Sequence, residues 1–167
     1  MTAANRVADI YLKQLELVEH DLVSLAKAMP ADKYDFRQAT GACGEMRTFG
    51  QQVKHAATMI FMTSAIVLGE KSPYGPGTDN NGPDSVQGKD QIVDYLERSI
   101  AYARTAMSSL TEKNHLEPLT THFGSQSRIE VASGVAFHSY NHYGQMVVYA
   151  RLCGIVPPTS VPSSARQ

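Results

Sequence analysis

The sequence lacks the features that would place it outside the ordinary globular proteins. Its 167 residues include only two cysteines, Cys43 and Cys153, which stand far apart and outside any CxxC pattern. Neither a zinc ribbon nor a redox dithiol can therefore be built from cysteine alone. A net charge of -1 provides no basic stripe for nucleic acid or for an anionic membrane. With 43% hydrophobic and 19% charged residues, the composition fits neither a disordered nor a membrane-spanning chain.

A secretory signal is also missing from the first residues, MTAANRVADIYLKQ, which have no charged segment followed by an apolar one. We therefore expect a cytoplasmic protein, and separate reduced thiols are compatible with that compartment. A TAAN start also fits a mature exported form that has lost its signal peptide, so the periplasm is the alternative. The length fits a single domain spanning residues 1–167.

Four segments carry apolar residues at alternating spacings of three and four, which is the period of an amphipathic helix. They cover residues 7–29, 48–68, 92–110 and 129–152. Thr48 and Gln51 form a capping-box pattern at the second start, and Gly69 and Gly154 are expected just beyond two of the ends. No segment shows the alternation of a strand. The sequence predicts an all-α four-helix bundle.

A long connection separates the second and third helices. Residues 70–88, EKSPYGPGTDNNGPDSVQG, are dense in Gly, Pro, Asn and Asp and have no period. Loops of that length inside a domain are usually crossovers or parts of a site. We therefore expect a crossover loop between these two helices in place of a tight hairpin.

Histidines occupy core positions on two of the predicted helices. The seam of the last helix contains His138, His142 and Gln145 where a bundle expects Leu or Ile, and continues to Leu152. On the second helix His55 lies on a seam with Gln52, Met59, Met62 and Ile66. Residues four apart on a helix are about 6 Å apart, so two imidazoles at that spacing can bind one ion and a third can join from a facing helix.

A single interior histidine is more often a hydrogen-bonded core residue than a ligand. Three interior histidines would bury several polar ring nitrogens. Each nitrogen left without a hydrogen-bond partner costs about 1–3 kcal/mol of stability. A shared metal ion satisfies them at once. The pattern therefore favours a metal site formed by His55, His138 and His142.

The other polar candidates carry less weight. His20 lies off the first seam, and His115 and His122 fall in an irregular segment. We expect His122 to be a solvated loop residue, and a place at the opening of a cleft is the alternative. Neither cysteine is expected to bind the metal. No carboxylate lies on the two histidine seams, and Glu45 and Asp84 stand in connectors, so no general base is assigned.

The segments RTFGQQVKHAA and, about 80 residues later, HSYNHYGQMVVYARLCGIVPP resemble the DinB/YfiT-like superfamily of bacterial four-helix bundles. That family has a histidine early in its second helix and an HxxxHxxQ pattern on its last, which His55, His138, His142 and Gln145 match. Tyr143 departs from the pattern, because His or Arg is common there. The resemblance implies an up-down-down-up bundle, a divalent metal that is nickel or zinc, and a homodimer.

The same resemblance implies chemistry on a small-molecule substrate. Some related proteins are transferases that use a low-molecular-weight thiol, and others resemble metal-dependent hydrolases. We therefore expect a metal-dependent enzyme that activates a bound thiol or water, with Gln145 behind the ligands or anchoring the substrate. A non-catalytic metal-binding or ligand-binding bundle is one alternative. A structural homodimer with a polar, metal-free core network is another.

Overall fold

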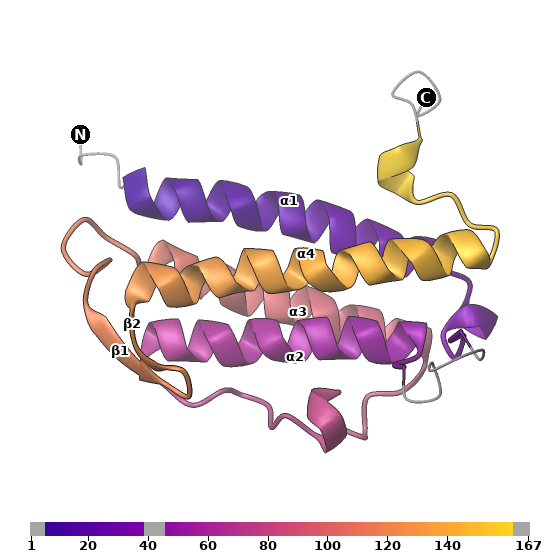
Figure 1. Cartoon of the computed structure of the whole chain (residues 1–167), viewed down its shortest axis with the longest axis horizontal. Helices are drawn as coiled ribbons and strands as arrows, with labels where there is room; N and C mark the ends of the chain where they lie inside the picture. The colour runs from indigo at the N-terminus through magenta and orange to yellow at the C-terminus, as the bar shows by residue number, and fades with distance from the viewer. Residues whose placement is uncertain (1–5, 39–45, 162–167) are drawn as a thin grey trace.

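The structure is a computed structural model that describes residues 6–38 and 46–161. Within these residues four long helices pack side by side and run nearly along one axis (Figure 1). They are α1 (Arg6–Ala28), α2 (Phe49–Leu68), α3 (Gly88–Ser108) and α4 (Arg128–Leu152). The predicted all-α bundle is confirmed.

The four helices follow the up-down-down-up order. α1 and α4 run in one direction, and α2 and α3 run in the other (Figure 1). α2 packs against α3 and α4, and α1 packs against the same two helices. α1 therefore lies diagonally opposite α2. Because α2 and α3 run in the same direction, the segment that joins them must return along the length of the bundle. Residues 69–87 form this connection. The predicted crossover is therefore confirmed.

The helix ends follow from local side-chain chemistry. The Thr48 hydroxyl accepts the Gln51 N–H while the Gln51 side chain accepts the Thr48 N–H, which confirms the predicted capping box. Gly69 ends α2 with φ 73°, a left-handed conformation that favours glycine. Ser127 and Glu130 form a second capping box at the start of α4. These caps satisfy backbone N–H and C=O groups that a helix leaves free.

The expectation that no strand would form is wrong. β1 (Pro118–Thr121) pairs with β2 (Gly124–Ser127) as an antiparallel hairpin between α3 and α4. Its strands, PLTT and GSQS, are too short and too polar to show an apolar alternation. Arg128, directly after β2, donates hydrogen bonds to the Val67 carbonyl and to Glu117, and so ties this end of the hairpin to α2.

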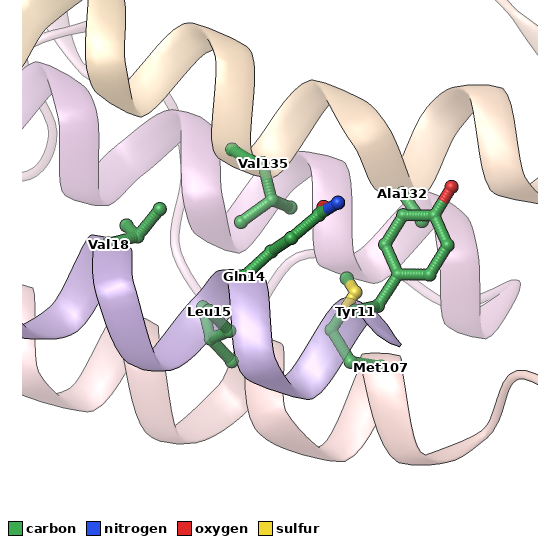
Figure 2. A pocket seen from close by; sticks show the side chains of 8 residues that line it. Tyr11, Gln14, Leu15, Val18, Met107, Ala132 and Val135 are labelled. Carbon is green, nitrogen blue, oxygen red and sulfur yellow. The ribbon is translucent and has the colours of Figure 1, made fainter. Parts of the chain in front are cut away.

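The interface of α1 with α4 is closely packed. The Tyr11 hydroxyl donates to the Ile129 carbonyl at 3.0 Å and lies 3.0 Å from the Ser133 hydroxyl. Beside it, Val18, Val135 and neighbouring side chains leave a void of only about 10 Å³ (Figure 2). That space holds at most about one water molecule. This void therefore offers no room for a ligand.

None of the described helices combines the length with the apolar character that crossing a membrane requires.

The crossover loop is anchored on the bundle by a buried glycine. Gly82 has φ 76°, and a Cβ placed there would lie 2.7 Å from Thr58 Oγ1 and 3.2 Å from the Tyr95 ring. Its N–H donates to the Pro76 carbonyl. The loop can therefore approach α2 and α3 closely only because residue 82 has no side chain.

Replacing Gly82 with alanine should destabilise the protein more than the same change at Gly69. Both substitutions place a side chain at positive φ, which costs about 1–2 kcal/mol. Gly69 has no atom within 4 Å of the new Cβ, whereas the close contacts at Gly82 should add about 1–3 kcal/mol. Urea denaturation of Gly82→Ala and Gly69→Ala measures the difference. Equal losses would show that the loop is not docked at Gly82.

Candidate metal centre

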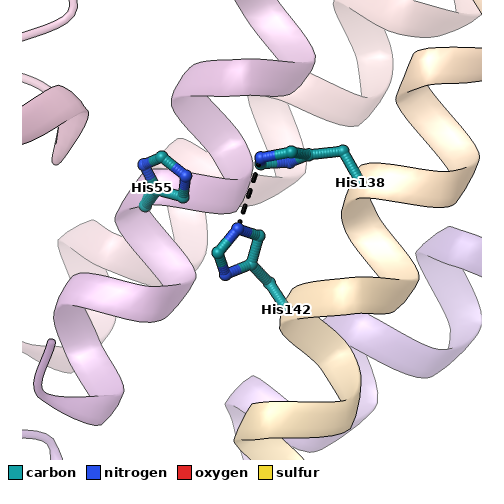
Figure 3. A group of neighbouring side chains, drawn as sticks. All are labelled: His55, His138 and His142. Atoms are coloured by element: carbon teal, nitrogen blue, oxygen red, sulfur yellow. Dashed lines mark hydrogen bonds between the residues drawn. The ribbon is translucent and has the colours of Figure 1, made fainter. Parts of the chain in front are cut away.

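The three predicted histidines meet between α2 and α4. α4 presents His138 and His142 one turn apart, and α2 presents His55 toward them (Figure 3). The ring centroid of His142 lies 4.5 Å from the ring centroid of His55 and 4.5 Å from that of His138. The centroids of His55 and His138 are 5.2 Å apart. One ring nitrogen from each residue lies within 4.8 Å of the other two. The grouping expected from helical spacing is therefore present.

A hydrogen bond from His142 to the side chain of Gln52 orients the His142 ring. His142 Nδ1 lies 2.7 Å from Gln52 Oε1, and because an amide oxygen only accepts, Nδ1 carries the hydrogen. The lone pair of Nε2 then points into the group, where it lies 3.3 Å from His138 Nε2 (Figure 3). Gln52 therefore selects the tautomer of His142 that can bind an ion.

A backbone carbonyl of the crossover loop orients His55. His55 Nδ1 lies 2.9 Å from the Asn80 oxygen, so this nitrogen donates and Nε2 is left with a lone pair. Asp79 and Asn80 adopt positive φ of 53° and 58°, which non-glycine residues rarely do. Backbone strain of this kind persists only where surrounding contacts hold it.

Arg47 supplies those contacts. Its Nε donates to Asn81 Oδ1 at 2.7 Å, and its terminal nitrogen donates to the Asp79 carbonyl at 2.8 Å. The Arg47 carbonyl in turn accepts the Tyr149 hydroxyl of α4 at 3.0 Å. Arg47 therefore joins the loop, the start of α2 and the end of α4 around the histidines.

The three rings are neutral at pH 7. His55 and His142 are only 7% and 6% exposed. Burial, together with smaller contributions from the neighbouring rings and Arg47, lowers the pKa of His142 to about 3 and that of His138 to about 4. Burial also lowers the pKa of His55 against the opposing effect of the Asn80 hydrogen bond. Neutral imidazole is the form that binds metal ions.

The donor set fits a divalent ion. Two nitrogens bound to one tetrahedral ion at about 2.0–2.1 Å lie about 3.3–3.4 Å apart, which is the separation of the His138 and His142 Nε2 atoms. Hydrogen bonding within the group is also incomplete, because His138 Nδ1 is buried without a partner. Among the described residues no carboxylate or thiol joins the group. An ion held here would therefore have three nitrogen ligands and open positions.

Gln145 is linked to the histidine group through Gln52. Its Oε1 accepts a hydrogen bond from Gln52 Nε2 at 2.8 Å, and its own amide nitrogen donates weakly to the Asn141 carbonyl at 3.4 Å. Gln52 therefore stands between Gln145 and His142. Gln52 lies on the predicted histidine seam one turn before His55, and this position is the sequence signal that points to its role.

Part of the predicted α4 seam is wrong. Leu152 is 56% exposed, and His138 and Gln145 are only half-buried, whereas Ser139 and Met146 are fully buried. The buried face of α4 is therefore shifted around the helix from the predicted seam toward Ser139 and Met146. The histidines lie at the border of that face, where α4 meets α2.

The other sequence candidates that the structure describes do not join the three histidines. His20 is exposed and bonds Asp21, and Cys153 is half-buried near the end of α4. Asp84 does not join the histidine group. Cys43 and Glu45 lie outside the described residues.

A cleft of about 340 Å³ opens directly beside the histidine group. It lies between α2, α4 and the β1–β2 hairpin, and His138 forms part of its wall. His122, expected to be a solvated loop residue, is exposed on the hairpin turn. It also lines this cleft, which was the alternative expectation.

Comparisons with known proteins agree with this architecture. The sequence pattern described as the DinB superfamily matches residues 14–146. A DinB-like protein from Bacillus cereus ATCC 10987 is 18% identical with a TM-score of 0.68, over 89% of this chain and 93% of that one. A putative member of the DinB family from Exiguobacterium sibiricum 255-15 is 19% identical with a TM-score of 0.62, over 88% and 91%. No curated protein matches the chain.

The buried histidines should make the metal-free protein sensitive to acid. As the pH falls from 6.5 toward 4, the unfolded chain binds protons at His138 and His142 that the folded chain excludes. The free energy of unfolding should therefore fall, by at most about 1.4 kcal/mol per pH unit for each histidine. Denaturation of chelated protein across this pH range measures the slope.

His138→Gln should flatten this slope, and His122→Gln, an exposed histidine of the hairpin, should keep the wild-type slope. Parallel curves for wild type and His138→Gln would contradict the burial of a neutral ring at this position.

Gln52→Ala should weaken metal binding more than Gln145→Ala. Removing a group that orients a metal-binding histidine costs about 10–100-fold in affinity. Gln52 contacts His142 directly, whereas Gln145 contacts only Gln52. Competition with a chromophoric zinc chelator measures both affinities. An equal or larger loss in Gln145→Ala would place Gln145 closer to the metal than Gln52.

Proposed function

The chain belongs to the DinB superfamily, and from this premise we propose that it is a metal-dependent enzyme acting on a small molecule. Its site holds one divalent ion on His55, His138 and His142. The observation that carries this proposal is the convergence of three neutral imidazoles. In two of them the Nδ1 atom, which faces away from the group, is hydrogen-bonded: that of His55 to the Asn80 carbonyl and that of His142 to Gln52. Such preorganisation removes much of the cost of assembling a metal site.

Nickel or zinc is the ion that we propose. Imidazole nitrogens bind these two ions more tightly than manganese or iron, and no oxygen ligand among the described residues favours magnesium or calcium. Three protein ligands leave positions open for substrate, which distinguishes catalytic from structural sites. When bound, the ion acts as a Lewis acid that lowers the pKa of water or of a thiol.

The chain itself positions the metal-binding side chains and gives access to them. Gln52 and the Asn80 carbonyl hold the two imidazole tautomers, and Arg47 keeps the loop in place above His55. The cleft beside His138 gives a small substrate access to the open side of the group. These features support transfer of a low-molecular-weight thiol to an electrophile or hydrolysis of a small molecule as the reaction class.

One observation favours a second candidate, a metal-binding or ligand-binding bundle without turnover. No carboxylate among the described residues joins the histidine group, so the chain offers no evident general base. Turnover assays with a panel of thiols and electrophiles separate this candidate from the enzyme. The homodimer, the lack of nucleic-acid binding and the cytoplasmic compartment, with the periplasm as its alternative, stay predictions.

Elemental analysis of the protein purified without a histidine tag tests the site first. Wild type should contain about one equivalent of nickel or zinc, or take it up on addition. His55→Ala and His138→Ala should each lose it, because two nitrogen ligands bind more weakly than three. His122→Ala removes a histidine outside the group and should keep the metal.

A wild-type protein that is purified without metal and fails to bind added zinc or nickel would overturn the proposal. The three histidines would then form a polar network within the bundle.

A further inference from the structure

The cleft beside His138 has the size and lining of a small-molecule site. Its volume of about 340 Å³ lies within the range of about 300–1,000 Å³ that is usual for ligand pockets. Most of the wall is apolar, with Met59 and Ile66 from α2 and Val131 and Phe137 from α4. The void between α1 and α4 measures only about 10 Å³, so α4 is closely packed on that side and borders an open cleft on the other.

A glycine in the middle of α4 keeps the cleft open. Gly134 lines it, and a Cβ placed there would lie 3.4 Å from Thr63 Cγ2 and 3.8 Å from the Phe137 ring. Glycine inside a helix costs about 1 kcal/mol relative to alanine. No tight backbone turn explains Gly134, since its backbone lies within α4. A larger side chain would project into the space between α2 and α4.

Two exposed aromatic rings flank the cleft. Phe123, on the hairpin turn, is 80% exposed, and Phe137, on α4, is 67% exposed. Both line the cleft, and Phe137 directly precedes His138 in the chain. Large apolar side chains that stay in water around a concavity are typical of a binding surface. The concave shape and the continuity with the histidine group favour a small molecule over a protein partner.

The charge of the cleft is negative. Glu130 is its one carboxylate, and no lysine or arginine lines it among the described residues. The Ser127 N–H and hydroxyl both donate to Glu130 Oε2 and lower the pKa of this carboxyl group, so it is ionised at neutral pH. An anionic ligand would be repelled at this end of the cleft, whereas an amine would be attracted.

We propose that the cleft binds a small molecule with an apolar or aromatic body and a neutral or cationic remote end near Glu130, and that its reacting group lies at His138. The position of the reacting group rests on the proposed function. Binding of the apolar body does not, because it depends on the cleft wall and not on the ion.

Two probes with the same body and opposite charge test the proposal. 4-Phenylbutylamine and 4-phenylbutyrate are titrated by calorimetry into the full-length protein, both as purified and after chelation. In the chelated protein the amine should bind about fivefold more tightly than the carboxylate, as expected for one partly solvated charge pair. Glu130→Gln keeps the capping-box geometry and should remove this preference.

Filling the cleft should abolish binding. Gly134→Leu places a side chain in the cleft, whereas Gly144→Leu makes the same change on the same helix at a position with no atom within 4 Å of the new Cβ. Gly134→Leu should weaken amine binding at least about tenfold, and Gly144→Leu should leave it unchanged. Phe137→Ala truncates an exposed side chain and should weaken binding about fivefold, which provides a second test if Gly134→Leu does not fold.

Three results would overturn the proposal: equal amine binding in Gly134→Leu and Gly144→Leu, tighter binding of 4-phenylbutyrate to chelated wild type, or no binding of the amine at about 10 mM. Metal content is measured in every variant. Unchanged metal with no cleft binding would remove this inference and keep the proposed metal site. Amine binding to a protein that takes up no metal would remove the proposed metal site and keep the binding of the apolar body in the cleft.

Discussion

The burial of three imidazole rings between α2 and α4 is the constraint on which the rest of the site depends. Each ring has two nitrogens, and a buried polar atom left without a partner costs about 1–3 kcal/mol. The chain meets this cost in part with the Gln52 amide and the Asn80 carbonyl. These two partners leave lone pairs of His55 and His142 directed toward His138. The arrangement that satisfies the outer nitrogens therefore also prepares the inner ones for an ion.

This constraint gives the crossover loop a second role. Topology requires a long connection because α2 and α3 are parallel neighbours. The same connection carries the Asn80 carbonyl to His55, and it is held there by Arg47 and by the close approach at Gly82. Changes in loop docking would therefore alter the orientation of His55 without touching a histidine. Structure and site are coupled through this one segment.

The two sides of α4 differ in how they are packed. Toward α1 the helix is closely packed, with Tyr11 bonded across the interface. Toward α2 it has polar contacts at the histidines and an open apolar cleft next to them. A helix with both faces in use does not need a single apolar stripe. This is why the predicted seam of α4 mixed core residues with site residues and extended to the exposed Leu152.

The sequence by itself determined the four helices, the capping box at Thr48, the long connection between α2 and α3, and the place of each of the three histidines on its own helix. These features depend on residues close together in the chain, where helical period and turn chemistry act directly. Only the tertiary structure decided that Gln52 orients His142 while Gln145 stands behind it, that a backbone carbonyl orients His55, and that a polar hairpin and Gly134 shape a cleft. Those features depend on contacts between segments far apart in the chain or on backbone groups that every residue has, so no local pattern could predict them.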